Sequence, residues 1–460
     1  MTKANQSGEI FHAIHFRADM CIGCSHCMNI CPVEAIRVRE GKARLIPNRC
    51  VDCGECYRVC PVGAIAVEQN DFEEIFRFPI RIALIPSVFF GQFPETISRE
   101  EIVHSIMDLG FTHVHEVEEG AGFLNRLYIE YRKNNPNNRP LISPFCPAIV
   151  RLIEVKFPTL LDNIILLKNP MEITAMKARK DLTEKGYKDT EIGIFYVSPC
   201  AAKIVAIKSP VGEKDSSVSG VINLNYLYNK TFRLIRNLKK AHGPLPGPNF
   251  SSQEICWSLT HGETDLAESG RNLAIDDIKN VIEFLEKLEN EEIKGIDFLE
   301  LRACDESCAG GILCPANRFL TAEKMKKRVQ NTLSEGKEEK KIEYTPEMEK
   351  FLRDHISLEK LTPRPILKLD DNVAEAVVKM KRMYELNGFL PQVDCGICGS
   401  PSCKALAEDI VQHTAELKQC IFIQKIMEQN EKLDIQESVN IMRKIWSESK
   451  LDKNSLRDEI

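Results

Sequence analysis

The pattern of hydrophobic and polar positions changes twice along the 460-residue chain. From about residue 76 to residue 329, short apolar runs alternate with stretches of helical spacing. The expected strands are residues 81–90, 112–117, 141–143, 192–197 and 298–301, and residues 101–109 have the spacing of a helix. Strands that alternate with helices are typical of an α/β domain, so the middle of the chain predicts largely parallel sheets.

The two ends follow other patterns. Alternating residues around Glu40 and Gly41 predict a hairpin between residues 36 and 47. Residues 323–341 are dense in lysine and glutamate, which predicts a helix end followed by a solvated linker. Residues 372–387 have helical spacing, and one face of a last helix would carry Ile435, Val439, Met442 and Trp446.

Composition narrows the class of protein. The apolar fraction is 43% and the charged fraction 28%, which is ordinary for a chain that buries a core. A net charge of −6 gives no basic surface for nucleic acid. No run of 18 apolar residues predicts a membrane span, and the first twenty residues lack the apolar core of a signal peptide. We therefore expect a cytoplasmic protein whose 18 clustered cysteines are reduced and bind metal.

Eight of these cysteines form two runs of the same spacing, 29 residues apart. Each run reads C-x2-C-x2-C-x3-C-P, which is the pattern of bacterial two-cluster ferredoxins. One expected [4Fe–4S] cluster is held by Cys21, Cys24, Cys27 and Cys60. The other is held by Cys50, Cys53, Cys56 and Cys31. A pair of zinc sites is the alternative, but zinc does not account for two consecutive four-cysteine runs.

Three expected strands of the middle region lead directly into cysteines. Cys146 and Cys200 each stand where a strand gives way to a helix, and Cys304 and Cys308 follow the strand at 298–301. Sites in open α/β sheets form beyond the carboxyl ends of strands, and a helix N-terminus favours a thiolate. The four cysteines could therefore converge on one metal centre, and Gly310 and Gly311 would let the backbone approach a bulky cofactor.

Together these three segments resemble the signature segments of the iron-only ([FeFe]) hydrogenases. That family has TSCCPxW, MPCxxKxxE and ExMACxxGCxxGG, and this chain has SPFCPAI from residue 143, SPCAAKIVA from residue 198 and ELRACDESCAGG from residue 300. The resemblance implies an H-cluster, in which a [4Fe–4S] cubane is joined to a di-iron unit that carries CO, cyanide and an azadithiolate. By position Cys146, Cys200, Cys304 and Cys308 would hold the cubane. Cys308 would be the bridge to the di-iron unit, and Lys203 would contact a cyanide.

The chain also departs from the family at positions near the implied cofactor. Phe145 replaces the cysteine that relays protons, and Ala206 replaces a glutamate that the resemblance places next on the proton route. The family's methionines near the di-iron unit are Ser198 and Arg302, and a glycine of the third segment is Ser307. If Arg302 points inward, its charge would favour the reduced cluster; if it points outward, it is a surface side chain.

These departures indicate a centre that interconverts H2 with protons and electrons slowly. They resemble the sensory branch of the family, which lacks the relay cysteine and would report hydrogen or redox state to a partner. A different proton path is also compatible with the substitutions. The second reading is a hydrogenase-like iron–sulfur protein without the di-iron unit, acting in electron transfer or iron–sulfur assembly. The implied partners are an electron-carrier or signalling protein and the hydrogenase maturation factors.

A last group of cysteines lies near the C-terminus. Cys395, Cys398, Cys403 and Cys420 resemble a small [4Fe–4S] module, in which Cys403 begins an amphipathic helix that ends near Cys420. Zinc is the alternative there. The helical tail that follows would pack on this module or form an interface with a partner or a second copy of the chain. Cys256 and Cys314 remain as structural thiols.

The expected fold is therefore an α+β and α/β multidomain protein. Its expected parts are a two-cluster ferredoxin-like domain at 1–75 and a two-lobed hydrogenase-like H-cluster domain at 76–330. A charged linker at 331–364 would follow, then a four-cysteine module at 365–425 and a helical tail at 426–460.

Overall fold

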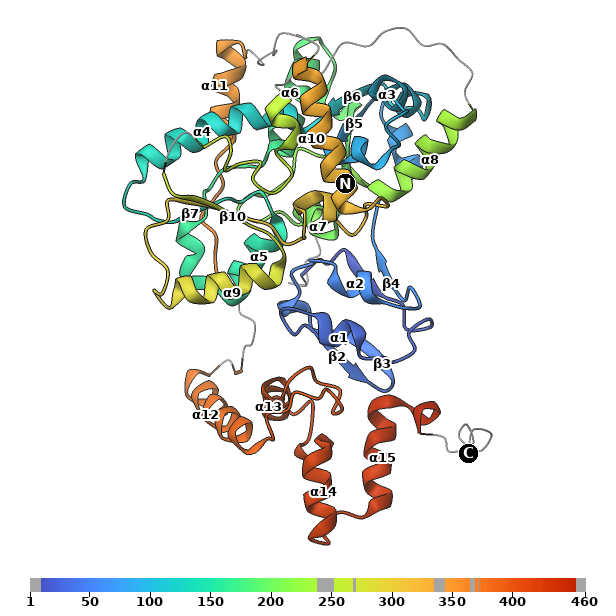
Figure 1. The fold of residues 1–460 in the computed structure, drawn as a ribbon, viewed down its shortest axis with the longest axis vertical. Helices are drawn as coiled ribbons and strands as arrows, with labels where there is room; N and C mark the ends of the chain where they lie inside the picture. Colours follow the sequence, from blue (N-terminus) through green and yellow to red (C-terminus); the bar gives the residue numbers. More distant parts are fainter. Residues whose placement is uncertain are drawn as a thin grey trace. The chain divides into compact units, whose positions relative to one another are not determined.

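The computed structural model describes residues 10–237, 252–267, 270–334, 344–364, 369, 370 and 372–451. The chain divides into two compact units, and each contains segments that are distant in sequence (Figure 1). The cluster-rich unit comprises Met1–Cys50, Gly54–Val67 and Arg364–Ile460. The central unit comprises Val51–Cys53 and Glu68–Pro363. None of the helices within the described ranges is both long and apolar enough to cross a membrane.

The first sheet of the central unit has four parallel strands in the order β6-β5-β8-β9. These strands are β5 (Ile80–Ile85), β6 (His113–Glu116), β8 (Ile192–Ser198) and β9 (Gly220–Asn223). Every residue of β8 is buried, as expected for a central strand covered on both faces. Helices α3 (Arg99–Asp108) and α8 (Leu224–Asn237) pack against each other beside this sheet. The expected strand at 81–90 ends early, because Pro86 has no N–H to donate and Ser87–Gln92 turn into a 3-10 helix.

The second sheet of the central unit is also parallel, in the order β10-β11-β7. Its strands are β7 (Leu141–Ile142), β10 (Asn272–Ile275) and β11 (Phe298–Leu301). The helices of this part are α4 (Ala121–Asn134), α5 (Pro147–Lys156), α6 (Pro170–Glu184), α7 (Ala201–Lys208), α9 (Ile278–Glu289) and α10 (Arg318–Ser334). The two parallel sheets bear out the α/β prediction for this region. The four-residue strands β9 and β10 were not predicted, since neither shows a sustained apolar or alternating run.

The segment predicted as a charged linker differs from expectation. Pro346–His355 form helix α11, and Met348 and Leu352 on it are buried in a core cluster with Phe123 and Trp257. Residues 335–343 of that segment lie outside the described residues. Lysine and glutamate dominate the composition of the segment, so its sequence does not reveal the two apolar residues that pack in the core. Because Met348 and Leu352 pack there, α11 belongs to the central unit.

The N-terminal part of the cluster-rich unit is built from two short helices and two antiparallel strand pairs. The helices are α1 (His26–Ile30) and α2 (Glu55–Val59), and the pairs are β1 (Ile14–Phe16) with β4 (Ile65–Val67) and β2 (Ile36–Arg39) with β3 (Lys42–Leu45). The second pair is the predicted hairpin. Its turn places Glu40 and Gly41 at φ of 54° and 67°, the two positive values that a type I′ turn requires.

The C-terminal part of the same unit is helical. It contains α12 (Val373–Phe389), α13 (Cys403–Val411), α14 (Ile421–Gln429) and α15 (Ile435–Trp446). The prediction that the helix from Cys403 continues to near Cys420 was wrong, because the helix ends at Val411 and Cys420 begins a separate helix. The expected face of the last helix is confirmed only in part: Met442 and Trp446 pack partly buried against the core, but Ile441 and Ile445 are the buried residues and Ile435 is exposed. Residues 452–460 of the expected tail lie outside the described residues.

The C-terminal part packs directly on the β2–β3 hairpin. The amide of Val38 donates to the carbonyl of Gly399 at 2.9 Å, and the amide of Gly41 donates to the carbonyl of Ile445 at 2.8 Å. The carboxylate of Asp409 lies 2.7 Å from Arg37 and 2.8 Å from Arg39. These side chains are largely buried, so the two arginines depend on one carboxylate for their counter-charge. The two cysteine-rich ends of the chain therefore form one structural unit.

Candidate metal centres

Two cysteines of the central unit lie at the start of helices that follow parallel strands. Cys146 follows β7 and is the N-cap of α5, and Cys200 follows β8 and is the N-cap of α7. The positive end of the helix dipole favours a thiolate at such a position. Cys304 and Cys308 lie in the turns after β11, where the amide of Cys308 donates to the carbonyl of Ser258 at 3.1 Å. Strand ends thus place all four cysteines as the sequence predicts.

The thiols of this set act on one another electrostatically. Burial raises the pKa of the Cys200 thiol to about 11, Lys203 lowers it, and Cys308 and Cys146 raise it further. Cys304 stands four residues before Cys308, in a turn where the amide of Ser307 donates to its carbonyl at 2.9 Å. Cys146, Cys200 and Cys308 lie near enough to act on one another, and thiols grouped in this way are a donor set suited to a cubane, whose iron replaces the thiol protons.

Lys203 lies against the cysteine that the resemblance makes the bridge. Its Nζ is 3.0 Å from Cys308 Sγ, and the side chain is buried with only 6% of the residue exposed. Burial lowers the pKa of Lys203, but Cys308, Tyr196 and Cys200 more than compensate, and the pKa lies well above its ordinary value. The ammonium group is therefore a fixed positive charge at the Cys308 end of the site.

Two cations lie over the ring of Phe145. Its ring centroid is 4.4 Å from Lys203 Nζ and 4.0 Å from the guanidinium carbon of Arg302. Arg302 points inward, which decides between the two orientations that the sequence left open: only 1% of it is exposed. It forms ion pairs with Glu263 at 2.8 Å and Glu300 at 3.4 Å. Burial lowers the pKa of Arg302, the two glutamates raise it, and the net direction is upward.

A buried polar network continues behind Arg302. The Ser143 hydroxyl donates to Glu263 at 2.7 Å, and the amides of Glu263 and Thr264 donate to Glu300 at 2.9 Å and 3.0 Å. Burial raises the pKa of Glu263 and Arg302 lowers it, with a net upward direction. Two carboxyl groups that face one guanidinium therefore favour retention of a proton on Glu263.

A small cavity lies beside Cys308, with a volume of about 10 Å³, which is room for about one water molecule. Its walls are Pro86, Val117, Glu118, Phe145, Asn169, Pro170, Met171, Tyr196, Lys203, Trp257, Ser258 and Cys308. Two of these residues, Trp257 and Ser258, have a buried side-chain donor, Nε1 and Oγ, without a hydrogen-bond partner among the described residues. Glu118 is the carboxyl group of these walls, and burial raises its pKa to about 8 while hydrogen bonds from Ser87 lower it.

The remaining substituted positions lie apart from this cavity. Ser198 is buried and its hydroxyl donates to the carbonyl of Cys200 at 2.7 Å, so it shapes the Cys200 loop. Ser307 is buried in the Cys304–Cys308 turn. Ala206 is half-buried in the wall of a different cavity, which also includes Pro144 and Met171.

The eight N-terminal cysteines lie in two segments, each a loop with one short helix, that make the same local contacts. The amide of Ala35 donates to Cys31 Sγ, and the amide of Ala64 donates to Cys60 Sγ, both at 3.2 Å. Burial raises the pKa of Cys27 to about 12, and Cys24, Cys21 and Cys60 raise it further. That electrostatic grouping matches one of the two expected ligand sets, in which the fourth cysteine comes from the other run.

The four C-terminal cysteines line one cavity. Burial raises the pKa of Cys398 to about 11, and Cys395 and Cys420 contribute to this rise. A Cβ atom at Gly396 would lie 3.1 Å from the Met28 methyl carbon, so this cysteine loop lies against α1, the helix that contains Cys27. The C-terminal site and one ferredoxin-type site are therefore neighbours in the cluster-rich unit.

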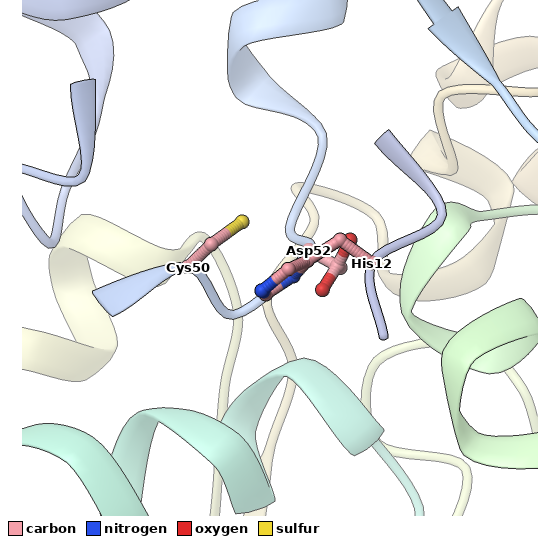
Figure 2. A group of neighbouring side chains, drawn as sticks. All are labelled: His12, Cys50 and Asp52. Carbon is pink, nitrogen blue, oxygen red and sulfur yellow. The ribbon is translucent and has the colours of Figure 1, made fainter. Parts of the chain in front are cut away.

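Figure 2 shows a further neighbour of a ferredoxin-type cysteine. A ring nitrogen of His12 lies within 4.8 Å of Cys50 Sγ, and both residues are buried. Asp52, also labelled there, follows Cys50 in the same loop. Because Cys50 is already an expected cluster ligand, we interpret His12 as a residue beside that cluster. No spacing along the chain points to His12, Trp257, Ser258 or Glu118, since each reaches its site only through the tertiary fold.

Comparison with known proteins adds to this picture. Residues 81–229 match the family described as "Iron only hydrogenase large subunit, C-terminal domain". This stretch includes Cys146, Cys200 and Lys203 and ends before Cys304. Residues 20–64 match "4Fe-4S dicluster domain", and residues 390–422 match "Putative Fe-S cluster". The chain is thus a hydrogenase-like iron–sulfur protein.

Individual relatives are distant. The chain is 24% identical over 227 residues to the NADP-reducing hydrogenase subunit HndD of Solidesulfovibrio fructosivorans, a match that covers 45% of this chain and only 37% of that subunit. A variant of the [FeFe]-hydrogenase HydA1 from Chlamydomonas reinhardtii is 14% identical, with 62% of this chain and 94% of that chain covered and a TM-score of 0.46. A second solved structure, an [FeFe]-hydrogenase HydA described under stepwise H-cluster assembly, is 14% identical. The match covers 64% of this chain and 97% of that chain, with a TM-score of 0.43.

Proposed function

We propose that the chain is an iron-only hydrogenase-type oxidoreductase with an H-cluster at Cys146, Cys200, Cys304 and Cys308. The observation that carries the proposal is the buried ammonium of Lys203, 3.0 Å from Cys308 Sγ within the convergent cysteine set. A buried lysine is retained only where it has a partner of opposite charge. When bound, the cofactor supplies the interconversion of H2 with protons and electrons.

The side chains around Cys308 favour slow turnover. Phe145 offers no proton at the position where the resemblance places the relay thiol, and Ala206 offers none at the second position. General acid–base steps typically contribute about 10²- to 10⁴-fold in rate. Arg302 points inward, and its positive charge would favour the more reduced, more negative state of a neighbouring cluster, an effect that its ion pairs with Glu263 and Glu300 reduce. Slow turnover with a favoured reduced state suits a sensor of hydrogen or redox state that signals through a partner protein.

The cluster-rich unit would exchange electrons with that partner. It contains all four cysteines of one ferredoxin-type set, three of the four of the other, and the C-terminal four-cysteine site, which lies against α1. We propose a [4Fe–4S] cluster at each of these three sites. Their ligands would be the eight cysteines of the two N-terminal runs and the four C-terminal cysteines, Cys395, Cys398, Cys403 and Cys420. An electron-carrier or signalling protein would dock on this unit, and maturation factors would deliver the di-iron unit.

A second function is favoured by the size of the cavity. A volume of about 10 Å³ leaves no room for a di-iron unit unless Lys203 and neighbouring side chains move. A protein that carries only the cubane would need no such movement. In that case the chain would act in electron transfer or iron–sulfur assembly.

Infrared spectroscopy of protein matured with hydrogenase assembly factors separates the two functions. Bands of iron-bound CO and cyanide, lost in a Cys308→Ala variant, are expected for the H-cluster reading. A Cys420→Ala variant is the matched control, because it removes a cysteine of the C-terminal site and should leave these bands intact. Absence of the bands from protein with a full complement of iron and sulfide would overturn the H-cluster proposal and support the cubane-only function.

A further inference from the structure

Cys395 is the one exposed cysteine of the chain. All 18 cysteines lie within the described residues, and every other one is buried or half-buried. Cys395 lines the same cavity as Cys398, Cys403 and Cys420, so it belongs to the C-terminal four-cysteine site. An exposed ligand leaves a bound iron–sulfur cluster close to solvent, within reach of an external electron carrier.

The surface around Cys395 is apolar. Four large apolar side chains are exposed there, and we call them the apolar collar: Phe389 (64%), Val393 (55%), Phe422 (42%) and Ile397 (37%). Each stands one or two positions from a residue that lines the four-cysteine cavity. Exposed apolar side chains gathered in one place mark sites of interaction with another molecule. The collar therefore surrounds the exposed edge of the expected cluster with a surface suited to docking.

The loop that carries the collar is held in place by hydrogen bonds. The Trp446 indole donates to the carbonyl of Ile397 at 2.7 Å. The amide of Cys403 donates to the carboxylate of Asp394 at 2.6 Å. Asp394 is the single charged residue between positions 388 and 398, and this hydrogen bond engages its carboxylate. A fixed loop with so little charge favours a partner that docks through uncharged, apolar side chains rather than through ion pairs.

The same loop also contacts the ferredoxin-type part of the cluster-rich unit. A Cβ atom at Gly396 would lie 3.1 Å from the methyl carbon of Met28. Met28 is fully buried and follows Cys27, an expected ligand of one ferredoxin-type cluster, while Gly396 follows Cys395. One van der Waals contact therefore joins the residues that stand next to ligands of two different expected clusters, and both residues lie within one compact unit.

From these contacts we infer that the C-terminal site is the electron port of the chain. An electron-transfer protein docks on the apolar collar around Cys395, and electrons pass across the contact between Gly396 and Met28 to the ferredoxin-type cluster at Cys27. The inference rests on the [4Fe–4S] cluster proposed above for the C-terminal site, and it does not need the di-iron unit. The partner presents a small, uncharged, apolar face over its own cofactor, since transient electron-transfer interfaces bury less than about 1,200 Å².

Each step of the transfer moves one electron and breaks no bond. The partner is oxidised as the C-terminal cluster is reduced. That cluster is then reoxidised as the ferredoxin-type cluster is reduced. The same steps run in reverse when the chain delivers electrons to an oxidised partner.

The docking step is tested with full-length, cluster-loaded protein on a gold electrode coated with a methyl-terminated alkyl monolayer, which presents an apolar, uncharged face. Voltammetry without H2 gives the rate of electron exchange with the clusters. Val393→Glu and Val393→Lys should each lower this rate at least about tenfold, because either charge would lose its water on docking. Ile435→Glu and Ile435→Lys are the matched controls, since Ile435 is exposed on α15 and lies outside the collar. Unchanged rates in both Val393 variants, or opposite effects of the two charges, would overturn the inference.

The relay step is tested by loss of the C-terminal cluster. In Cys420→Ala the ferredoxin-type clusters should exchange electrons with the same electrode at least about tenfold more slowly than in wild type. Cys395→Ser is a second variant, at the exposed position, which keeps the buried packing of the module. Electron paramagnetic resonance of the reduced proteins checks that the ferredoxin-type clusters are present. Wild-type exchange rates in both variants, or a C-terminal site that holds zinc instead of iron, would contradict the electron port.

Sedimentation of wild type and Val393→Glu examines the other occupant of the collar. A monomer in both cases supports docking of a separate electron-transfer protein. A wild-type dimer that the glutamate dissociates would overturn the inference and identify a second copy of the chain as the occupant. Neither the electrode nor the sedimentation measurement involves H2, so a failure of the proposed hydrogen chemistry would leave these results unchanged and remains distinguishable from a failure of the electron port.

Discussion

The guanidinium of Arg302 lies 4.0 Å from the ring centroid of Phe145. Lys203 approaches the same ring at 4.4 Å. A desolvated cation over an aromatic ring is stabilised by about 2 kcal/mol. The phenylalanine that stands in place of the relay thiol is therefore not an isolated change, because it packs against the two cations that border the cysteine site.

Substitution of Phe145 by cysteine should raise hydrogen turnover. The new thiol would lie beside Lys203 and Arg302, whose charges favour the thiolate and so make proton exchange easy near neutral pH. We expect an increase of at least about tenfold, at the low end of the contribution of an acid–base group. Hydrogen–deuterium exchange by matured protein measures it. Phe145→Ala is the control, as it removes the ring and adds no thiol, and equal rates for the two variants would contradict the prediction.

Substitution of Arg302 by methionine should destabilise the central unit by about 3–5 kcal/mol, because Glu263 and Glu300 then lose their buried counter-charge. Thermal unfolding of the metal-loaded protein measures the loss. Glu300 keeps two backbone donors, so Glu263 is the more dependent partner. The double variant Arg302→Met/Glu263→Gln should recover part of the stability, and a loss equal to that of the single variant would argue against the ion pair as the cause.

Glu118 should make the stability of the central unit fall as pH rises. Burial raises its pKa to about 8 in the folded chain, against 4.5 for the free side chain. A raised pKa means that the folded state holds its proton after the unfolded state has lost it, so the contribution is complete below pH 4.5 and disappears as pH rises through 8. The loss between these limits is on the order of 4 kcal/mol.

Denaturant unfolding at several pH values between 5 and 8, with wild-type protein and Glu118→Gln, isolates this effect. All other groups titrate equally in the two proteins, so the difference between their free energies of unfolding belongs to Glu118. The glutamine variant should gain on wild type as pH rises. Parallel pH profiles would show that Glu118 ionises normally in the folded chain.

Substitution of Asp409 by asparagine should loosen the C-terminal module from the β2–β3 hairpin. Arg37 and Arg39 would lose their shared counter-charge in a largely buried contact, which typically destabilises by about 3 kcal/mol or more. Limited proteolysis and thermal unfolding of the full chain measure the change.

The control for this variant is Asp434→Asn, the same chemical change at an exposed N-cap of α15. Asparagine caps helices about as well as aspartate, so little effect is expected there. Equal protease sensitivity of the two variants would show that the buried pairs with Arg37 and Arg39 do not hold the module.

Much of the fold, and the positions of the cysteines within it, could be predicted from local sequence. Cys146 and Cys200 could be placed at strand-to-helix junctions because the apolar run, the turn and the helix are contiguous. Arg302 could not be oriented in this way, because its inward position depends on Glu263, which lies 39 positions earlier in the sequence and on another element. The position of Trp257 beside Cys308 could not be predicted for the same reason, because no spacing in the sequence connects the two residues.

The errors at the C-terminal end have a related cause. Helical periodicity identified α15 and part of its inner side, with Met442 and Trp446, but it did not select Ile441 and Ile445 as the buried residues of one broad apolar side. The amides of Glu40 and Gly41 hydrogen-bond to the carbonyls of Lys444 and Ile445, and this docking selects Ile441 and Ile445 for burial. Which face a helix buries is thus decided by the surface it meets.

The contact between Arg37 and Asp409 also has a consequence for the order of synthesis. The two residues are 372 positions apart, and at about 5–20 residues per second the ribosome adds Asp409 roughly 20–70 s after Arg37. Throughout that interval the hairpin has emerged while its buried partner does not yet exist. The segment that begins at Arg364 therefore completes the packing of the β2–β3 hairpin, which is translated long before it.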